Sequence, residues 1–461
     1  METDSLLLML IVQGAVVLII AIAHRHLVSA RLNLLVSSAF VTVPVWVYAP
    51  LEDVGIVYLF DIVVPVIFLI LLYKRFVLVG KSVVILGVPI FLLLLAYFPI
   101  GYFFVGPDYA AYHTLILSGL LYRSLLIFIA VSIVASELRY ADRLEFVRLM
   151  AFQFLALFAF GVMQYGLGID LVVYERIKDT ENVVDTLLSG QHKILFGFGF
   201  LGLFRGAVPQ MAVIALFWWL FLSLHPRANV RERLLLDLMC AFAIICIAAV
   251  LSRIGVMALI FVLLYAALVD KGWRIRGFIY TVMVSILVLS QPDLRSSLVN
   301  GIELVSDRFS MEQLTGQAGS GSTRLVSAMA LFHNSTENLW PWFVGVGGYN
   351  PIAANEYYGV FGMHGDYLDI LARYGIFAGI LYLLVIMAIF WRPLKGFFSR
   401  VPERRVLARS FGVLVIGIAI LALTQGALTF SGTAGYLACA QTWMAVAFAI
   451  ASRKIEKGRY V

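Results

Sequence analysis

The longest polar stretch of this sequence reads GSGSTRLVSAMALFHNSTENLWPWFVGVGGYN (residues 319–350) and HGDYLDILARYG (residues 364–375). The first part carries an arginine, a Trp-Pro-Trp and a glycine-rich turn, and the second leads directly into an apolar run. Charged and aromatic residues at the edge of an apolar run are typical of a membrane border. We therefore expect part of any reaction centre to lie between Gly319 and Gly379.

The composition around this stretch indicates a membrane protein. Hydrophobic residues make up 62% of the 461 residues and charged residues only 13%, whereas a soluble domain has about 45–50% and about 25%. The fold class expected is therefore an all-α polytopic membrane protein. The net charge of +7 is better explained by basic cytoplasmic loops than by nucleic-acid binding. The three cysteines all lie in apolar runs and suggest neither a disulfide framework nor a metal site.

Apolar runs recur along the chain at lengths that fit spanning helices, which predicts about 12–14 transmembrane helices. They cover 5–23, 32–49, 56–73, 82–105, 115–136, 147–169, 208–224, 234–251, 254–269, 275–290, 366–391, 410–428 and 433–451. The short, glycine-rich segment 194–207 reads as a re-entrant or broken helix, which a membrane tolerates only where protein or water covers its backbone.

The basic residues predict the orientation of these helices. Most of the 34 lysines and arginines fall in alternate connections, which places those connections and the C-terminus in the cytoplasm. The two long outer connections are expected to fold together as a periplasmic cap. The predicted organisation is N-terminal transmembrane helices (1–169), a first periplasmic loop with the re-entrant segment (170–207), central helices (208–290), a large periplasmic loop (291–365) and C-terminal helices (366–461).

Ten basic residues depart from this orientation, and three of them are expected to face the outer side at the membrane surface: Arg205, Arg253 and Arg324. An arginine near a span is costly unless it is paired or hydrated, so it is a functional candidate. Guanidinium groups bind phosphate oxygens in pairs and stay charged at any relevant pH. A cluster at headgroup depth would suit a lipid-linked diphosphate. The alternative for each arginine is a structural pair, with Asp366 or a loop carboxylate, or a lipid headgroup anchor.

His364 precedes a span on the same side and is the side chain best suited to accept a proton near neutral pH. Asp366 is placed to orient its imidazole; the alternative is an interfacial histidine bonded to loop backbone. Trp342 and Tyr349 either stack on sugar rings or belong to an interfacial aromatic belt. The remaining histidines lack metal-ligand spacing, so no metal and no cofactor are expected.

At these residues the sequence resembles the bacterial O-antigen polymerase and O-antigen ligase superfamily of integral-membrane glycosyltransferases. The resemblance rests on pieces in the expected order over about residues 195–390. They are Arg205-Gly with Pro209, Ser252-Arg253-Ile-Gly255, Arg324 with a following Trp-Pro and the Gly345-Val-Gly347 turn, and the His364 segment with Tyr367-Leu368, Leu371, Gly375 and Gly379. The chain departs from the family at the histidine, where the family often has His-Asn and this chain has His364-Gly365-Asp366, and at Arg373, where an acidic residue is common.

The resemblance implies a donor glycan on undecaprenyl diphosphate in the outer leaflet of the bacterial inner membrane. An acceptor hydroxyl then attacks the anomeric carbon with inversion, and neither metal nor nucleotide sugar takes part. By similarity, Arg205 and Arg253 hold the diphosphate, and His364 positions or deprotonates the acceptor. Arg324, Asp366, Tyr349, Trp342 and Tyr367 are the candidate substrate-binding residues. Membrane lipids and a chain-length regulator are further candidate partners.

The motifs leave three functions open. A polymerase that joins lipid-linked repeat units is favoured over a ligase that moves the glycan to lipid A core or to protein. A transporter or flippase for a lipid-linked sugar would need paired half-helix breaks in two related halves. The sequence shows one broken segment, and its charges gather at one face.

Overall fold

The computed structural model describes residues 29–40, 45–47, 55–57, 62–73, 110–140, 142–167, 207–249, 253–290, 366–423, 427–428 and 436–458, with a few single residues between 15 and 25. Its labelled elements are α2 (Ala30–Phe40), β1 (Val45–Val47), β2 (Gly55–Val57), α4 (Ala110–Glu137), α5 (Arg143–Leu167), α8 (Ala207–Leu224), α9 (Val230–Ala249), α10 (Arg253–Val269), α11 (Lys271–Ser290), α17 (Asp366–Leu394), α18 (Pro402–Leu421) and α19 (Tyr436–Gly458). A further helix covers Ile62–Tyr73.

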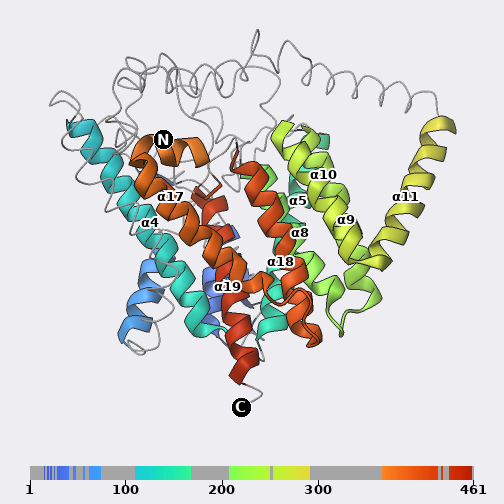
Figure 1. Ribbon diagram of the computed structural model, residues 1–461, viewed down its shortest axis with the longest axis horizontal. Helices are drawn as coiled ribbons and strands as arrows, with labels where there is room; N and C mark the ends of the chain where they lie inside the picture. Colours follow the sequence, from blue (N-terminus) through green and yellow to red (C-terminus); the bar gives the residue numbers. More distant parts are fainter. Residues whose placement is uncertain are drawn as a thin grey trace, which may run out of the picture.

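Helix α8 lies at the centre of the bundle (Figure 1). Its residues are apolar on all sides, and Ala207 to Ser223 are all buried. A helix that is hydrophobic all round must be enclosed by other helices. Helices α5, α9, α10, α18 and α19 pack against it.

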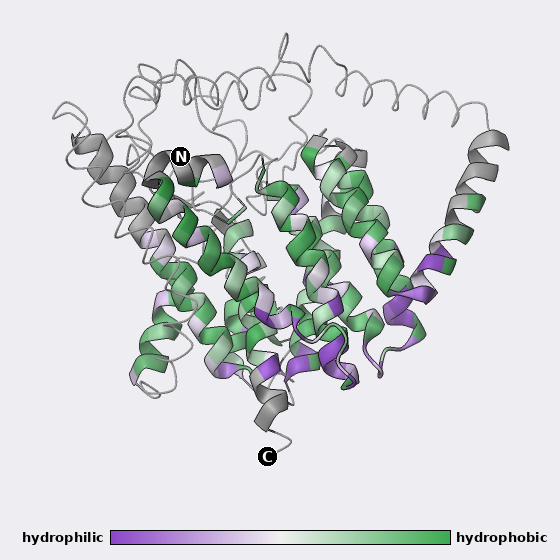
Figure 2. Cartoon of the chain, in the orientation of Figure 1, coloured by the Kyte–Doolittle hydropathy of each residue, from purple (hydrophilic) through white to green (hydrophobic). Residues whose placement is uncertain are grey.

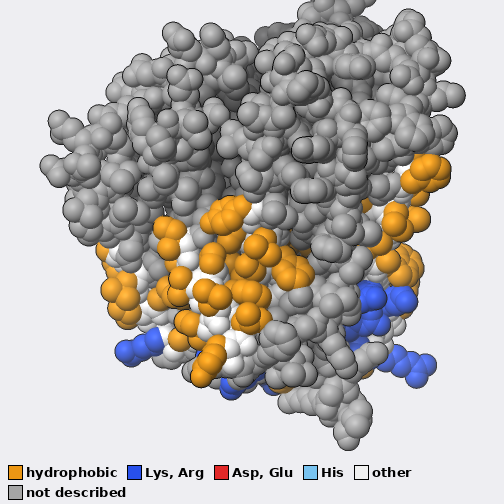
Figure 3. All heavy atoms as spheres, turned by 90° about the vertical axis from the view of Figure 1, so that its left-hand side faces the viewer, with side chains coloured by type: hydrophobic (Ala, Val, Ile, Leu, Met, Phe, Trp, Pro, Cys, Tyr) orange, Lys and Arg blue, Asp and Glu red, His pale blue; other side chains and the backbone are white. Residues whose placement is uncertain are grey.

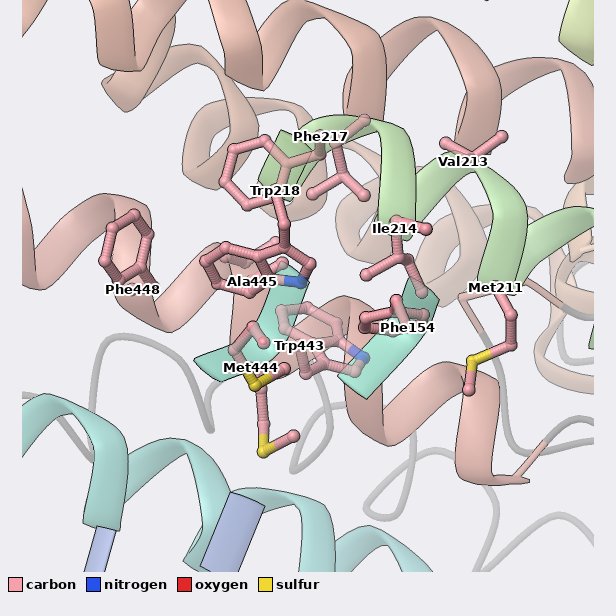
Figure 4. Close-up of a cluster of buried hydrophobic side chains, with 14 of the residues drawn as sticks. Phe154, Met211, Val213, Ile214, Phe217, Trp218, Trp443, Met444, Ala445 and Phe448 are labelled. Atoms are coloured by element: carbon pink, nitrogen blue, oxygen red, sulfur yellow. The ribbon is translucent and has the colours of Figure 1, made fainter. Parts of the chain in front are cut away.

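Aromatic rings fill the space between α8 and its neighbours (Figure 4). Trp218 of α8 meets Phe448 of α19 edge-on, with ring centroids 5.0 Å apart. Phe146 of α5 stacks on the same Phe448 at 5.6 Å. Edge-to-face and offset stacked pairs are the favoured geometries of aromatic rings. These contacts bring α5, α8 and α19 together at one level of the bundle.

Two glycines of α18 let neighbouring helices approach closely. A Cβ added at Gly417 would lie 2.4 Å from Val213 Cγ1 of α8. A Cβ added at Gly412 would lie 2.0 Å from the Tyr265 hydroxyl of α10, which donates a hydrogen bond to the Arg409 carbonyl at 2.9 Å. Small residues at helix contacts are the usual device for close packing of membrane helices.

The predicted spans 32–49 and 56–73 are wrong as single helices. Helix α2 ends at Phe40, and β1 and β2 pair as an antiparallel ribbon in which Val45 opposes Val57. Pro44 lacks the amide hydrogen that a continuing helix needs, and the valine-rich residues on either side have high strand propensity. The helix that follows covers only Ile62–Tyr73. The other described elements are helices, as expected.

Helix lengths give limited support for membrane spans. Within the described residues, Ala207–Leu224 is the single helix long and apolar enough to cross a membrane by itself. Ile254–Val269 and Lys271–Ile279 pass the same test together, but they are bent by 120°. This bend falls at the turn expected between two antiparallel spans. The number of spans stays a prediction.

The surface pattern is that of a bundle with an apolar flank. Figure 2 shows apolar residues along the helices and hydrophilic residues at their lower ends. Figure 3 shows apolar side chains on the flank seen from the left, with lysine and arginine at its lower rim. In the helix Ile62–Tyr73, the side chains of Ile62, Val66 and Leu69 are exposed. Contiguous exposed apolar surface of this kind marks contact with membrane or another protein.

Candidate functional site

Ion pairs between helix ends define what we call the basic end of the bundle. They join Arg31 to Glu137, Arg143 to Glu403, Arg148 to Glu232 and Arg276 to Asp237, with N–O distances of 2.8–2.9 Å. The Arg453 guanidinium also donates to the Arg392 carbonyl. The described basic segments among those that the sequence places on one side of the membrane therefore lie at one end of the bundle. Which compartment this end faces stays a prediction.

The opposite end of the bundle carries the starts of three helices that follow or contain the sequence motifs. The Ser223 hydroxyl lies 3.3 Å from an Asp270 carboxylate oxygen, which joins the C-terminal ends of α8 and α10. Both helices therefore begin at the opposite end, α8 at Ala207 and α10 at Arg253. Helix α17 begins there as well, because the Tyr367 hydroxyl donates to the Ala419 carbonyl, near the C-terminal end of α18, at 3.2 Å.

The predicted site residues differ in how much of each one the structure describes. Arg253 and Asp366 are the first residues of α10 and α17, and only their backbone is described. The described part of α8 begins two residues after Arg205, and α17 begins two residues after His364. Five of the predicted residues lie outside the described residues: Arg205, His364, Arg324, Trp342 and Tyr349. Tyr367 is described, and its hydroxyl contacts α18.

A buried polar layer lies just inside the opposite end. The Gln210 amide, in the first turn of α8, donates to the Ala427 carbonyl and to the Thr442 hydroxyl oxygen, both at 2.8 Å. The Tyr382 hydroxyl donates to the Leu428 carbonyl at 3.3 Å. Non-helical backbone inside a membrane bundle needs such partners for its polar groups. Side chains of α8 and α17 therefore support the buried connection between α18 and α19.

The sequence prediction did not include this layer. The apolar run 410–428 predicts a helix to its end, but α18 stops at Leu421. The sequence Thr424-Gln425-Gly426 is the local signal for this earlier stop, since glycine costs about 1 kcal/mol in a helix interior. The Pro209-Gln210 pair was available as a second signal, because a glutamine in an apolar run needs a partner.

A second polar cluster joins three helix ends at the basic end. The Arg143 guanidinium, 5% exposed, pairs with Glu403 at 2.8 Å, and the Tyr140 hydroxyl donates to the same carboxylate at 3.0 Å. Burial alone would raise the pKa of Glu403, but the hydrogen bond and the charge of Arg143 outweigh it and hold the pKa below its usual value. Burial, and then the charge of Arg143, lower the pKa of His225.

The cluster at the basic end has a structural explanation. The His225 Nδ1 atom accepts the Arg227 backbone N–H at 3.2 Å, which suits a neutral imidazole. Among the described residues, no group of three histidine, cysteine or acidic side chains gathers into a metal site. The candidates that the structure describes, Arg253, Asp366 and Tyr367, lie at the starts of α10 and α17, at the opposite end.

Comparison with known families addresses the segment that contains those candidates. A family model described as O-antigen ligase matches residues 238–383, from α9 into α17. This match supports the O-antigen ligase and polymerase superfamily. The resemblance drawn from the motifs is therefore confirmed. The matched segment includes Arg253 and His364 but ends short of Arg205 on the N-terminal side. No curated protein matches the chain.

The match also fixes the coarse biochemical class. The O-antigen ligase family is one of glycosyltransferase-like enzymes of the inner membrane whose substrates are lipid-linked glycans. It supports an enzyme of the ligase or polymerase type, and it does not separate these two activities.

Proposed function

We propose that the chain is a polysaccharide polymerase, which joins lipid-linked repeat units at the outer face of the bacterial inner membrane. The observation that carries this proposal is the O-antigen ligase match over 238–383. Its segment contains Arg253 and His364, and the helices that begin at or beside the motifs start at the same end of the bundle. Three described helix starts that are distant in the sequence, Ala207, Arg253 and Asp366, lie at this one end, which supports a shared active site there.

In the proposed reaction, an acceptor hydroxyl attacks the anomeric carbon of a glycan carried on undecaprenyl diphosphate. A new glycosidic C–O bond forms, the C–O bond to the diphosphate breaks, and the lipid diphosphate leaves with the electron pair. Attack from the side opposite the leaving group inverts the anomeric centre. The acceptor proton passes to His364, the only proton acceptor near neutral pH among the motif residues.

Arg205 and Arg253 stabilise the charge that develops on the leaving diphosphate, because guanidinium forks bind phosphate oxygens in pairs. Arg324 assists at the diphosphate or the glycan, and Trp342 and Tyr349 stack on sugar rings. Asp366 orients the imidazole. Tyr367 contributes by holding the start of α17 against α18, since its hydroxyl bonds to Ala419.

The proposed placement in the membrane follows the basic residues. The basic end lies in the cytoplasm with the C-terminus, and the loops 170–207 and 291–365 cover the periplasmic end. Exposed apolar flanks such as that of Ile62–Tyr73 then contact lipid. A cysteine introduced in 291–365 should react with a membrane-impermeant reagent in intact cells. Labelling that requires permeabilised cells would contradict this topology.

The second candidate is an O-antigen ligase, which the description of the matching family favours. The chemistry would be the same, and the acceptor would be lipid A core or a protein instead of a second lipid-linked glycan. The acceptor therefore separates the two candidates experimentally.

The test uses purified protein and one synthetic repeat unit on undecaprenyl diphosphate, with no added metal. A polymerase makes a ladder of longer lipid-linked glycans from this substrate alone. Arg253→Ala and His364→Ala should each lose at least about 100-fold in rate, and Arg253→Lys should recover little, because a point charge replaces a bidentate fork. Arg231→Ala, which removes an exposed arginine near the basic end, is the matched control and should keep full activity.

A ladder that forms in the absence of lipid A core would support the polymerase. Transfer only after lipid A core or an acceptor protein is added would establish the ligase instead. No product with any of these acceptors would refute a glycosyltransferase and favour transport of a lipid-linked sugar.

A further inference from the structure

Two glutamines inside the helix bundle have no hydrogen-bond partner among the described residues. Gln441 of α19 is fully buried, and Gln153 of α5 is 8% exposed. Within the part of the chain that the structure describes, the nitrogen and the oxygen of both side-chain amides are without a partner. Each amide offers two donors and an acceptor with two lone pairs. Burying such a group unpaired costs about 1–3 kcal/mol on the scale of protein substitutions, so this pair needs an explanation.

The aromatic contacts show that the two glutamines lie at one level of the bundle. Phe146 and Phe448 stack with ring centroids 5.6 Å apart, and α5 and α19 run in opposite directions. Gln153 follows Phe146 by about two helical turns, and Gln441 precedes Phe448 by the same interval. Both glutamines are therefore about 10 Å farther from the basic end than the stacked rings.

The same interval sets the direction in which the glutamines point. Two turns return a side chain to nearly the same face of its helix. Gln153 therefore lies on the face of α5 that carries Phe146, and Gln441 on the face of α19 that carries Phe448. Figure 4 draws Phe154 and Trp443, close in sequence to the two glutamines, in one cluster of buried side chains, so these two segments lie at a similar level of the bundle. The two unpartnered amides face the same interior region between α5 and α19.

The neighbouring glutamine provides a direct comparison. Gln210 is equally buried, yet its amide reaches the Ala427 carbonyl and the Thr442 hydroxyl at 2.8 Å. Thr442 follows Gln441 directly in α19, so all three glutamines belong to one layer. The packing of this layer satisfies one amide and leaves the other two without a partner among the described residues.

We propose that Gln153 and Gln441 form an uncharged binding site for hydroxyl oxygens inside the bundle. A hydroxyl oxygen donates and accepts hydrogen bonds, as a pair of amides requires. Its source is either internal water or a hydroxyl group of the glycan substrate, and the second source rests on the proposed function. Polar side chains inside a membrane bundle are costly and are retained for such roles.

The first arm tests for water in substrate-free protein. X-ray radiolysis turns ordered water into hydroxyl radicals, which oxidise an adjacent methionine to the sulfoxide. The chain supplies a reporter beside each glutamine, since Met150 and Met444 are fully buried about one turn away. Met239 of α9, fully buried as well, is the matched control. Water in the site oxidises both reporters several-fold faster than Met239, and Gln441→Leu abolishes the difference.

The second arm tests for a glycan hydroxyl with the lipid-linked repeat unit. If the substrate fills the site, both reporters oxidise at the Met239 rate without substrate. Gln153→Leu and Gln441→Leu each then raise KM by about two- to tenfold, as the loss of a hydrogen bond predicts, and leave kcat near the wild-type value. This pattern separates binding from a general loss of structure, which would lower kcat or the amount of folded protein.

Thermal unfolding decides the outcome even if the wild-type protein makes no product. A site that holds a ligand couples the two residues, so each leucine lowers Tm and the double variant resembles the singles. Leucine substitutions that each raise Tm with additive effects, both without and with the lipid-linked repeat unit, would show two unpaired amides and no site. If the two leucine substitutions have non-additive effects on Tm but change neither methionine oxidation nor KM, the side-chain amides of Gln153 and Gln441 bond directly to each other. Either result overturns the proposal.

Discussion

Replacement of Gly417 by alanine tests how closely α18 approaches α8. The added Cβ would lie 2.4 Å and 2.6 Å from the two methyl carbons of Val213. Real Cβ atoms essentially never come within 3.0 Å of another heavy atom, so one helix has to move. Val213 cannot turn away easily, because a β-branched side chain in a helix is held in one rotamer. Overpacking of this kind costs about 1–3 kcal/mol.

Alanine also gains helix propensity over glycine, which offsets about 1 kcal/mol of that cost. The expected net result for Gly417→Ala is a destabilisation of up to about 2 kcal/mol. Gly277 of α11 is the matched control, because a Cβ there meets nothing within 4 Å. Gly277→Ala should raise stability by up to about 1 kcal/mol. Thermal unfolding in mild detergent, followed by the fluorescence of the eight tryptophans, measures both effects as shifts in Tm.

The double variant identifies the contact responsible. Val213→Ala alone removes two methyl groups from the core and costs about 1.6 kcal/mol in transfer free energy. In the Gly417→Ala background the same change removes the clash, so the double variant should be more stable than the sum of the single effects predicts. Additive effects, or a rise in Tm for Gly417→Ala like that of Gly277→Ala, would refute the close approach of α18 and α8.

Further predictions concern the two polar clusters. Glu403→Gln leaves the Arg143 guanidinium buried without its countercharge and should lower stability by about 3 kcal/mol, measured by Tm against wild type at neutral pH. The lowered pKa of His225 favours the folded state when the imidazole is neutral, so this contribution is complete above about pH 6.5 and is lost as pH falls through the folded-state pKa. The Tm of His225→Gln should therefore fall by less than the Tm of the wild type between pH 7 and pH 5. An equal fall in Tm would contradict this. Gln210→Leu removes two hydrogen bonds and should cost about 1–3 kcal/mol, whereas Thr442→Val, which removes one of them, should cost less.

Helix positions were predictable where apolar runs are long and bounded by charge. The run 208–224 becomes α8, and 254–269 becomes α10, each with a shift of one residue at most. The free energy of burying apolar side chains decides these elements, and the sequence displays it directly. The ribbon at Val45–Val47 was not predicted, because hydropathy alone does not separate a valine-rich strand from a helix.

The gathering of charged segments at one end was also predictable, since the positive residues fall in alternate connections. The partners were not predictable, because Arg143 and Glu403 are joined across most of the chain length. The same holds for Gln210 and Thr442. Hydrogen bonds between distant helices depend on packing angles and depths, which local sequence does not encode.

The C-terminal part of α18, with the residues that follow it, contacts the first turns of two helices that come after candidate site residues. Its Ala419 carbonyl accepts the Tyr367 hydroxyl at the start of α17, and the connection that follows it accepts the Gln210 amide at the start of α8. Residues Arg205 and His364 directly precede these two helices. Because catalysis loses rate when reacting groups are displaced by even 1 Å, a rigid α18 is the element that can hold both helix starts in register. The close packing of α18 on α8 at Gly417 contributes to this as well. It fixes the position of α18 along the axis of α8, the helix that follows Arg205.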